Sequence, residues 1–425
     1  MLIVILMLVM VLSVGARSED SHPVVLGNEI FRRANYELIA GEKVAIFSNP
    51  SGFFQSDLTH IVDDMAAQGG KDDDFEVVVI LSPEHGFRGD LQAETGDPAV
   101  YVDKETGLPV VSAYKVEPAV LAKTLERMGV TCIVADVQDV GTRLYTFIWT
   151  LYDIQAAVAL MPTDTRLVVL DRPNPLSGKL VSGPVLNTTC CSSGYGKAAI
   201  PHVHGLTIGE LSLLFADDTG NMKGRVEVVA MEGWRRNMMW AQTGLFWGPP
   251  SPNLPTAVSA EVYPATVFIE ATTVSEGRGT TTPFEVFGAP FYNALEVAEG
   301  LNSAQLCGDR ACFRATSYIP TFGQYNNSDC RGVQFASARS TLSMDPFHAG
   351  LVVLRTLMDS APPSSFKWDG SWMGHPGTDL MDWYAGTPLV REMLDAGMSA
   401  EIIAARFAHE ADTFHSRSSR FYIYS

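Results

Sequence analysis

The adjacent residues Glu84 and His85 are the pair in this sequence best suited to proton transfer. They follow an apolar run and precede a glycine, a setting that partly removes a carboxyl group from water, as suits a general acid. We therefore expect Glu84 to protonate a leaving group, with His85 orienting it or contacting the substrate. A structural ion pair of Glu84 with Arg88 or Arg143, and a structural role for His85, are the alternatives.

Other charged side chains follow neighbouring apolar runs. Asp139 and Asp171 are candidates for a second catalytic carboxylate, for an arginine partner or for a helix cap. Arg88, Arg143 and Arg172 carry planar guanidinium groups, which bind carboxylates through two parallel hydrogen bonds. In an acidic chain, this gathering of arginines predicts a site for an anionic substrate.

The glycine-containing segment 273–285 has a composition suited to sugar recognition. It carries Glu276, Arg278 and five hydroxyl side chains. A solvated turn is the alternative interpretation. We take Glu276 as a further catalytic candidate and Arg278 as a candidate for substrate binding.

The sequence lacks the usual signatures of cofactor binding. No Gly-x-Gly-x-x-Gly follows the first predicted strand, and there is neither a Gly-x-x-x-x-Gly-Lys-Ser/Thr motif nor a Gly-x-Ser-x-Gly nucleophile elbow. His202 and His204 would share one face of a strand, as a metal pair requires, but no third ligand has a recognisable spacing. We therefore expect no cofactor and no metal.

Charge and the N-terminal residues bear on partners and location. The net charge of -18, from 48 acidic and 30 basic side chains, disfavours nucleic acids and anionic membranes as partners. Residues 2–12 are apolar and small residues follow them, so we predict a signal peptide over 1–16 and a secreted protein with no membrane partner after cleavage. A membrane anchor is the alternative, although a spanning helix needs about 20 apolar residues.

Six cysteines in a chain of 425 residues do not define a small disulfide-stapled fold. Cys307 and Cys312 flank a loop-like stretch and can pair outside the cell, whereas Cys190 and Cys191 are adjacent. Cys132 lies in an apolar run, which predicts a buried and unreactive thiol.

Four apolar runs alternate with helix-like stretches in the first half of the chain. This alternation predicts an α/β fold whose Rossmann-like parallel sheet has helices on both faces. Ligands of such sheets bind beyond the carboxyl ends of the strands. The candidate acids, His85 and the arginines that follow the apolar runs would lie there, together with Asn49, Gln138 and Asn174. The predicted strands are 43–47, 76–81, 131–137 and 166–170, and the predicted helices are 56–68, 117–128 and 147–160.

A proline-rich connector over 248–255 predicts a domain boundary. We expect a Rossmann-like catalytic domain over 24–250 and a smaller α+β domain over 251–425, whose early loops close over the site. In the second domain we expect strands at 261–270 and 332–336 and helices at 292–301, 346–359 and 400–413.

At these residues the chain resembles the exo-β-N-acetylmuramidases of the NamZ type (YbbC-like), secreted or periplasmic glycosidases of bacterial cell-wall sugars. The resemblance runs from about residue 41 to the C-terminus. Ser51, where threonine is usual, and Thr273, where asparagine is common, are minor departures. The matching stretches are 49–52, 83–89, 106–110, 138–146, 170–175, 204–210, 250–255 and 274–290.

The resemblance implies an active cleft between the two domains and release of N-acetylmuramic acid from the non-reducing ends of peptidoglycan fragments. Glu84 would be the leading catalytic residue, and Arg88, Arg143 or Arg278 would bind the lactyl carboxylate. The second catalytic group would be Asp139, Asp171, Glu276 or the substrate's own acetamido oxygen. A glycan-binding protein without turnover and a hydrolase of another N-acetylated sugar are the alternatives. The expected substrate-binding residues are Asn49, Arg88, Gln138, Arg143, Tyr145, Asp171, Arg172, Asn174, His204, Ser251, Asn253 and Arg278.

Overall fold

A computed structural model of the protein describes residues 23–70, 75–92, 100–220, 222–336 and 345–425. The predicted signal peptide, residues 1–16, lies outside these residues. Within the described ranges, the helices are too short or too polar for any of them to span a bilayer.

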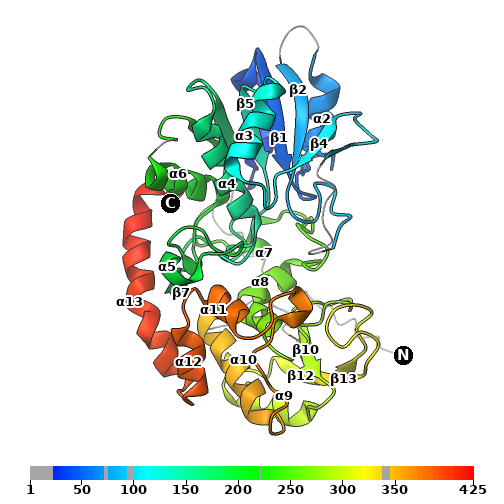
Figure 1. The fold of residues 1–425 in the computed structure, drawn as a ribbon, viewed down its shortest axis with the longest axis vertical. Helices are drawn as coiled ribbons and strands as arrows, with labels where there is room; N and C mark the ends of the chain where they lie inside the picture. Colours follow the sequence, from blue (N-terminus) through cyan, green and yellow to red (C-terminus); the bar gives the residue numbers. More distant parts are fainter. Residues whose placement is uncertain (1–22, 71–74, 93–99, 221, 337–344) are drawn as a thin grey trace, which may run out of the picture.

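The first domain is built on a seven-stranded sheet in the order β3-β4-β2-β1-β5-β6-β9 (Figure 1). The β3–β4 pair at one edge is antiparallel, and the other pairs are parallel. The four predicted strands are confirmed as β1, β2, β5 and β6. The strands are β1 (Glu42–Ser48), β2 (Phe75–Ser82), β3 (Val100–Val102), β4 (Pro109–Ser112), β5 (Cys132–Asp136), β6 (Arg166–Leu170) and β9 (Val226–Val229).

Helices cover both faces of this sheet because alternate strand side chains enter two separate apolar cores. Ala45 and Phe47 face the core under α3 (Pro118–Arg127), α4 (Phe147–Leu160) and α6 (Ile208–Thr219). Val44 and Ile46 face the core under α1 (Gly27–Arg33) and α2 (Ile61–Gln68).

The helix predicted from residue 56 begins five residues later, at Ile61. Leu58 has a left-handed backbone with φ of 61°, which no α-helix can include. The helix therefore starts after His60, whose side chain accepts a hydrogen bond from the Val62 amide.

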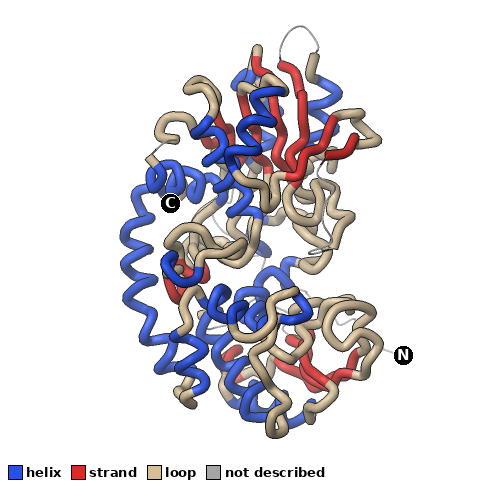
Figure 2. Tube along the Cα trace, viewed as in Figure 1, coloured by secondary structure: helices blue, strands red, loops and turns tan. Residues whose placement is uncertain are grey.

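The second domain packs helices on a three-stranded antiparallel sheet, β10-β13-β12 (Figure 2). This arrangement confirms the prediction of a Rossmann-like α/β domain followed by a smaller α+β domain. The strands are β10 (Val286–Ala289), β12 (Phe313–Tyr318) and β13 (Cys330–Phe335), with β11 (Leu306–Asp309) alongside. The helices are α8 (Ala257–Thr266), α9 (Ala294–Ser303), α10 (Pro346–Ser360), α11 (Asp379–Ala385), α12 (Leu389–Asp395) and α13 (Ala400–Ser418).

The strand predicted at 261–270 is wrong, because these residues form the end of α8 and the 3-10 segment η2 (Val267–Ala271). Their β-branched and aromatic side chains favour a strand by local propensity. Thr256 and Ser259 nevertheless form a capping box that starts the helix, and residues 259–266 are all buried. A helix buried on every side shows no amphipathic period by which its sequence could be recognised.

The two domains share apolar packing and a long connecting helix. Val140, Leu144 and Phe147 of the first domain belong to the same buried cluster as Phe268 and Phe284 of the second. Helix α13 runs along one side of the molecule from the second domain to α6 (Figure 1), and its end is tied there by an ion pair between Arg417 and Asp218. The connecting elements are β7 (Ser182–Val185), α5 (Thr188–Cys191), β8 (Pro201–Val203) and α7 (Trp240–Thr243).

The predictions for Cys307, Cys312 and Cys132 are confirmed, whereas no pairing was predicted for the adjacent Cys190 and Cys191. Cys307 and Cys312 form a disulfide, and so do the adjacent Cys190 and Cys191. Cys132 is a buried free thiol, and burial raises its pKa to about 12, so it stays protonated and unreactive at neutral pH.

Candidate active site

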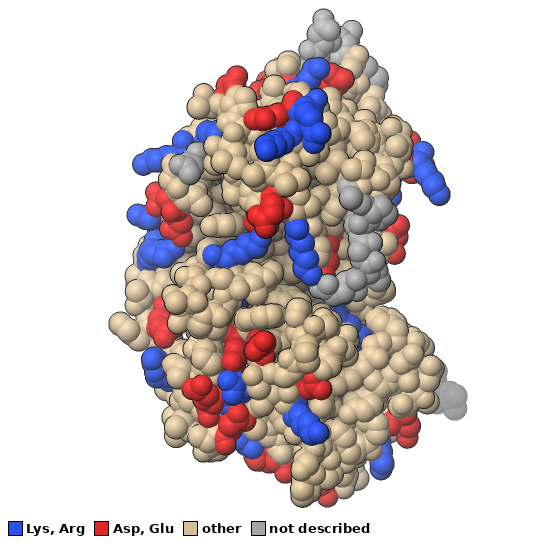
Figure 3. Space-filling model, in the orientation of Figure 1, with Lys and Arg blue, Asp and Glu red and all other residues tan. Residues whose placement is uncertain are grey.

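A pocket with about 450 Å³ of empty space, its open mouth included, lies between the two domains. The surface is indented where the domains meet (Figure 3). The wall of the pocket is formed by the end of β2 and the start of α4, together with η2, the segment 273–285 and α11. The lining residues are Glu84, His85, Tyr145, Thr146, Tyr195, Ser251, Asn253, Leu254, Tyr263, Glu270, Arg278, Phe284, Met373 and Tyr384.

Glu84 reaches the pocket because the chain turns sharply after β2. His85 has φ of 72°, a left-handed conformation that few residues other than glycine adopt. Thr146, the residue before the first turn of α4, donates a hydrogen bond from Oγ1 to Glu84 Oε2 at 2.7 Å. His85 is also on the wall, and its Nδ1 lies 3.1 Å from the Leu91 carbonyl oxygen. The sharp turn and the Thr146 hydroxyl together fix the direction of the Glu84 carboxylate.

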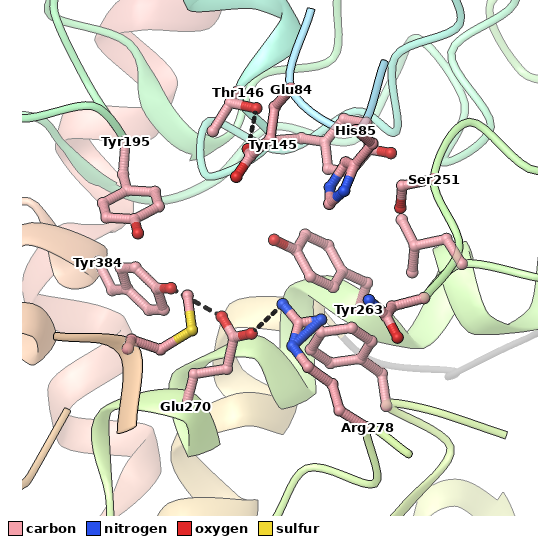
Figure 4. Close-up of a pocket in the computed structure, with 14 residues that line it drawn as sticks. Glu84, His85, Tyr145, Thr146, Tyr195, Ser251, Tyr263, Glu270, Arg278 and Tyr384 are labelled. Atoms are coloured by element: carbon pink, nitrogen blue, oxygen red, sulfur yellow. Dashed lines mark hydrogen bonds and ion pairs between the residues drawn. The ribbon is translucent and has the colours of Figure 1, made fainter. Parts of the chain in front are cut away.

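A second carboxylate, Glu270 of η2, faces Glu84 across the pocket (Figure 4). Only 1% of Glu270 is exposed, and Tyr384 donates a hydrogen bond to its Oε2 at 2.7 Å. Arg278 Nη2 donates to its Oε1. Burial raises the pKa of Glu270, and the Glu84 charge acts in the same direction, while Arg278 and Tyr384 oppose the shift. Our sequence analysis did not include Glu270.

Glu276 and Arg278 come from the segment 273–285, but they do not both line the pocket. Arg278 is on the wall, whereas Glu276 lies behind it, with Glu276 Oε1 3.4 Å from Arg278 Nε. Burial raises the pKa of Glu276 to about 7, against the opposing effect of Arg278. Gly277 separates the two residues with φ of +86°, and a Cβ there would lie 2.4 Å from the Val286 carbonyl oxygen. Glycine is therefore required for this segment to present Arg278.

Four tyrosines give the pocket flat apolar surfaces with polar edges, as sugar-binding sites commonly have. Tyr145 and Tyr263 pack edge to face with their centroids 6.0 Å apart, and Tyr195 and Tyr384 do so at 4.9 Å. The Tyr263 hydroxyl points into the space between the two carboxylates (Figure 4). Among the described residues it has no hydrogen-bond partner, so it is available to a ligand.

Six of the sixteen predicted site residues line this pocket: Glu84, His85, Tyr145, Ser251, Asn253 and Arg278. Asn253 Nδ2 donates to Gln92 Oε1 at 3.0 Å. The residues that the sequence analysis missed include Thr146, Tyr195, Tyr263, Glu270 and Tyr384.

Arg88 and Arg172 do not line this pocket, and acidic side chains elsewhere bind both of them, so their role in substrate binding stays a prediction. Arg88 lies between Asp63 and Asp103, with one contact of 2.8 Å to Asp63 and two of 2.8 Å to Asp103. Arg172 is buried against Asp136, with contacts of 2.5 and 3.0 Å.

Arg143 is fully buried, does not line the pocket and binds main-chain oxygens of the protein. Its guanidinium group donates to the carbonyl oxygens of Tyr195, Trp383 and Tyr384. Burial lowers the pKa of Arg143 to about 9, so it remains charged at neutral pH. Since Tyr195 and Tyr384 line the pocket from different domains, Arg143 positions two of its walls.

Asn49 and Gln138 contact the loops beyond the central strands. Asn49 Nδ2 donates to the Gln138 carbonyl oxygen at 3.1 Å, and the Gln138 side chain donates to the carbonyls of Asp139 and Pro173. Neither residue lines the pocket described above, which includes residues after β2 and at the start of α4. Their role in substrate binding stays a prediction.

The remaining predicted residues serve turns and helix ends. Asp139 accepts a hydrogen bond from the Gly141 amide at 2.7 Å, and its Oδ2 lies 3.2 Å from His204 Nε2. Asp171 accepts from the Gly209 amide in the first turn of α6, and Asn174 donates to the Leu206 carbonyl. None of these four residues lines the pocket described above, and the roles predicted for Asp139 in catalysis and for Asp171, Asn174 and His204 in substrate binding stay predictions.

His202 Nε2 lies 2.7 Å from the Pro264 carbonyl oxygen, inside the protein. Within the described ranges, no three histidine, cysteine or acidic residues are placed to hold a metal ion.

The fold and the pocket define an α/β protein with a second domain, whose interdomain site combines opposed carboxylates, an arginine and aromatic rings. Carboxylate pairs and aromatic platforms of this kind occur in glycoside hydrolases.

Comparison with known families identifies the chain more closely. The family model for the N-terminal domain of the exo-β-N-acetylmuramidase NamZ matches residues 44–258, and the model for its C-terminal domain matches residues 261–424. The chain therefore belongs to the NamZ family of exo-β-N-acetylmuramidases, and the predicted glycosidase family is confirmed.

Individual relatives agree with this assignment. The chain is 37% identical over 393 residues to the peptidoglycan β-N-acetylmuramidase NamZ of Bacillus subtilis (strain 168), covering 91% of this chain and 88% of that protein. Two crystal structures of DUF1343 family proteins from Bacteroides fragilis NCTC 9343 are similar, with TM-scores of 0.76 and 0.72. Each is 28% identical and covers 95% of this chain and 99% of its own.

Proposed function

We propose that the protein is a secreted exo-β-N-acetylmuramidase that releases N-acetylmuramic acid from the non-reducing ends of peptidoglycan fragments, with Glu84 as the general acid. The observation that carries this proposal is the position of Glu84 on the wall of an interdomain pocket, oriented by Thr146. Family membership supports the choice of sugar.

In the proposed reaction the protonated Glu84 gives its proton to the glycosidic oxygen. The bond between that oxygen and the anomeric carbon then breaks, and its electron pair stays with the departing sugar.

Arg278 is the candidate for recognition of the lactyl carboxylate, because it is the one arginine or lysine among the described residues of the pocket wall. Its Nη2 donates to Glu270, and its Nε lies near Glu276. Among the described residues no hydrogen bond engages Nη1, which leaves this atom for a ligand anion, to which guanidinium groups bind strongly.

The proposed secretion is supported by the apolar segment at residues 2–12 and by two disulfides. Disulfides persist mainly in oxidising compartments outside the cytoplasm. Expression of the full chain with a C-terminal tag, followed by N-terminal sequencing of the exported protein, tests this location. A mature N-terminus just after residue 16 is expected, and retention of residues 1–16 on a cytoplasmic protein would contradict secretion.

The activity is tested with a chromogenic β-N-acetylmuramoside and with the same glycoside lacking the lactyl group. We expect hydrolysis of the first and much slower hydrolysis of the second. Equal rates would identify a hydrolase of another N-acetylated sugar. Protection of the protein against heat by the sugar, without any colour release, would identify a glycan-binding protein.

A further inference from the structure

Glu270 is a buried carboxylate on the wall of the candidate active site, and the reaction as described so far gives it no part. It lies at the end of η2 and faces Glu84 across the space that a substrate would occupy (Figure 4). The question is whether Glu270 acts on the sugar or only supports the fold.

The contacts of Glu270 hold both of its oxygens and leave the carboxylate directed at the pocket. Tyr384 donates to Oε2 at 2.7 Å, and Arg278 donates to Oε1. Two such donors favour the ionised form of the carboxylate, against the larger effect of burial, and they fix its direction. An ionised group in a site shielded from water interacts strongly with a charge that develops nearby.

Glu276 provides a comparison within the same cluster. Both glutamates are 1% exposed and both contact Arg278, but Glu276 lies behind the arginine and is not on the pocket wall. A substrate in the pocket would therefore contact Glu270 and not Glu276. Asp139 and Asp171, the other candidates from the sequence, are engaged in turns and helix ends.

We propose that Glu270 is the second catalytic carboxylate of this pocket and stabilises the positive charge at the anomeric carbon from the side opposite Glu84. This inference rests on the proposed glycosidase function. Glu84 gives its proton to the glycosidic oxygen, and the sugar becomes oxocarbenium-like while Glu270 remains an anion. A water molecule then adds its oxygen to the anomeric carbon from the side of the departed group, and its proton goes to Glu84. One water is consumed, Glu84 is protonated again, and the released sugar keeps the β configuration.

The test compares Glu270→Gln with Glu276→Gln in the full chain, using a chromogenic β-N-acetylmuramoside. The two substitutions are isosteric and remove one buried carboxylate each from the same arginine. We expect kcat to fall about 100- to 1,000-fold in E270Q with little change in KM, as when a preorganised electrostatic group is removed. For E276Q we expect kcat within about fivefold of the wild type, as for a group that does not touch the transition state.

An unchanged kcat in E270Q, or equal losses in the two variants, would overturn the proposal. Release of the α anomer, seen by NMR of fresh product, would also overturn it, because Glu270 would then act as a base on water.

If E270Q fails to fold, Tyr384→Phe removes one donor to Glu270. We expect kcat to fall about 5- to 30-fold at constant KM, as for a lost hydrogen bond of about 1 to 2 kcal/mol, and a wild-type kcat would refute the role. Wild-type protein that hydrolyses no muramoside would instead contradict the proposed function itself.

Discussion

Replacing Thr146 by valine removes the hydroxyl group that donates to Glu84 and keeps the shape of the side chain. In the wild type this hydrogen bond spans 2.7 Å between Thr146 Oγ1 and Glu84 Oε2. Thr146 is only 6% exposed, so water does not readily replace the lost donor.

The size of the effect follows from the change in charge on Glu84 during the reaction. A hydrogen bond to a neutral acceptor contributes about 1 kcal/mol and one to an ionised group about 1.5 to 3 kcal/mol. As Glu84 gives up its proton the bond strengthens, and the transition state gains roughly 0.5 to 2 kcal/mol relative to the bound substrate. At about 1.36 kcal/mol per tenfold change in rate, T146V should lower kcat about 2- to 30-fold.

The assay is steady-state hydrolysis of a β-N-acetylmuramoside, with KM expected to change little. Thr150→Val is the matched control, because Thr150 is buried one turn later on α4 and donates to the Thr146 carbonyl at 3.3 Å without contacting Glu84. T150V should keep the wild-type kcat. A wild-type kcat in T146V, or equal losses in both variants, would refute the argument that Thr146 orients a proton donor.

Three further predictions concern the framework of the site. Asp136→Ala leaves Arg172 buried without its partner and should lower the free energy of unfolding, measured by urea denaturation, by about 3 to 5 kcal/mol. A raised KM in the folded variant would instead support substrate binding by Arg172. Burial raises the pKa of Asp171 to about 7, so its contribution to the free energy of unfolding is full below its unfolded pKa of about 4 and is lost as the pH rises through 7. Asp171→Asn should therefore remove up to about 4 kcal/mol of the pH dependence of stability between pH 4 and 8. An unchanged pH profile of unfolding would contradict the shift. Gly277→Ala should lower kcat/KM more than tenfold, because the added Cβ would displace Arg278, and a displaced positioning group can cost about 100-fold. Gly397→Ala is the control, since Gly397 also has a positive φ but lies in open space, and it should leave kcat/KM unchanged. Equal activity of the two variants would refute the steric argument.

The sheet and the loop that carries Glu84 follow from local sequence. The central parallel strands β1, β2, β5 and β6 are largely apolar, because helices cover both faces of the sheet, and such runs are visible without a structure. The sheet topology then places the polar residues that follow a strand. It was therefore possible to predict that Glu84 and His85 lie beyond the carboxyl end of β2.

The partners of the arginines could not be predicted in this way. Arg172 is neutralised by Asp136, which lies 36 residues earlier, and Arg143 is held by carbonyl oxygens about 240 residues later. Main-chain acceptors leave no mark on the sequence, so a structural arginine looks the same as one that binds a substrate.

Glu270 was missed for a related reason. It is the last residue of the segment 261–270, which we interpreted as a strand, although these residues form the end of α8 and most of η2. A glutamate after the apolar residues 267–269 was the available signal, because a buried charge requires a partner or a function. Tyr195 and Tyr384 carried no local signal, since the fold brings them together from separate domains.

The most direct test of the central claim is the turnover of Glu84→Gln on a β-N-acetylmuramoside, measured beside its thermal stability with and without the product sugar. Glutamine keeps the shape of the side chain but has no proton to give. We predict that E84Q folds, is still protected against heat by the sugar, and shows no detectable turnover. Wild-type turnover by folded E84Q would contradict the claim that Glu84 protonates the leaving group.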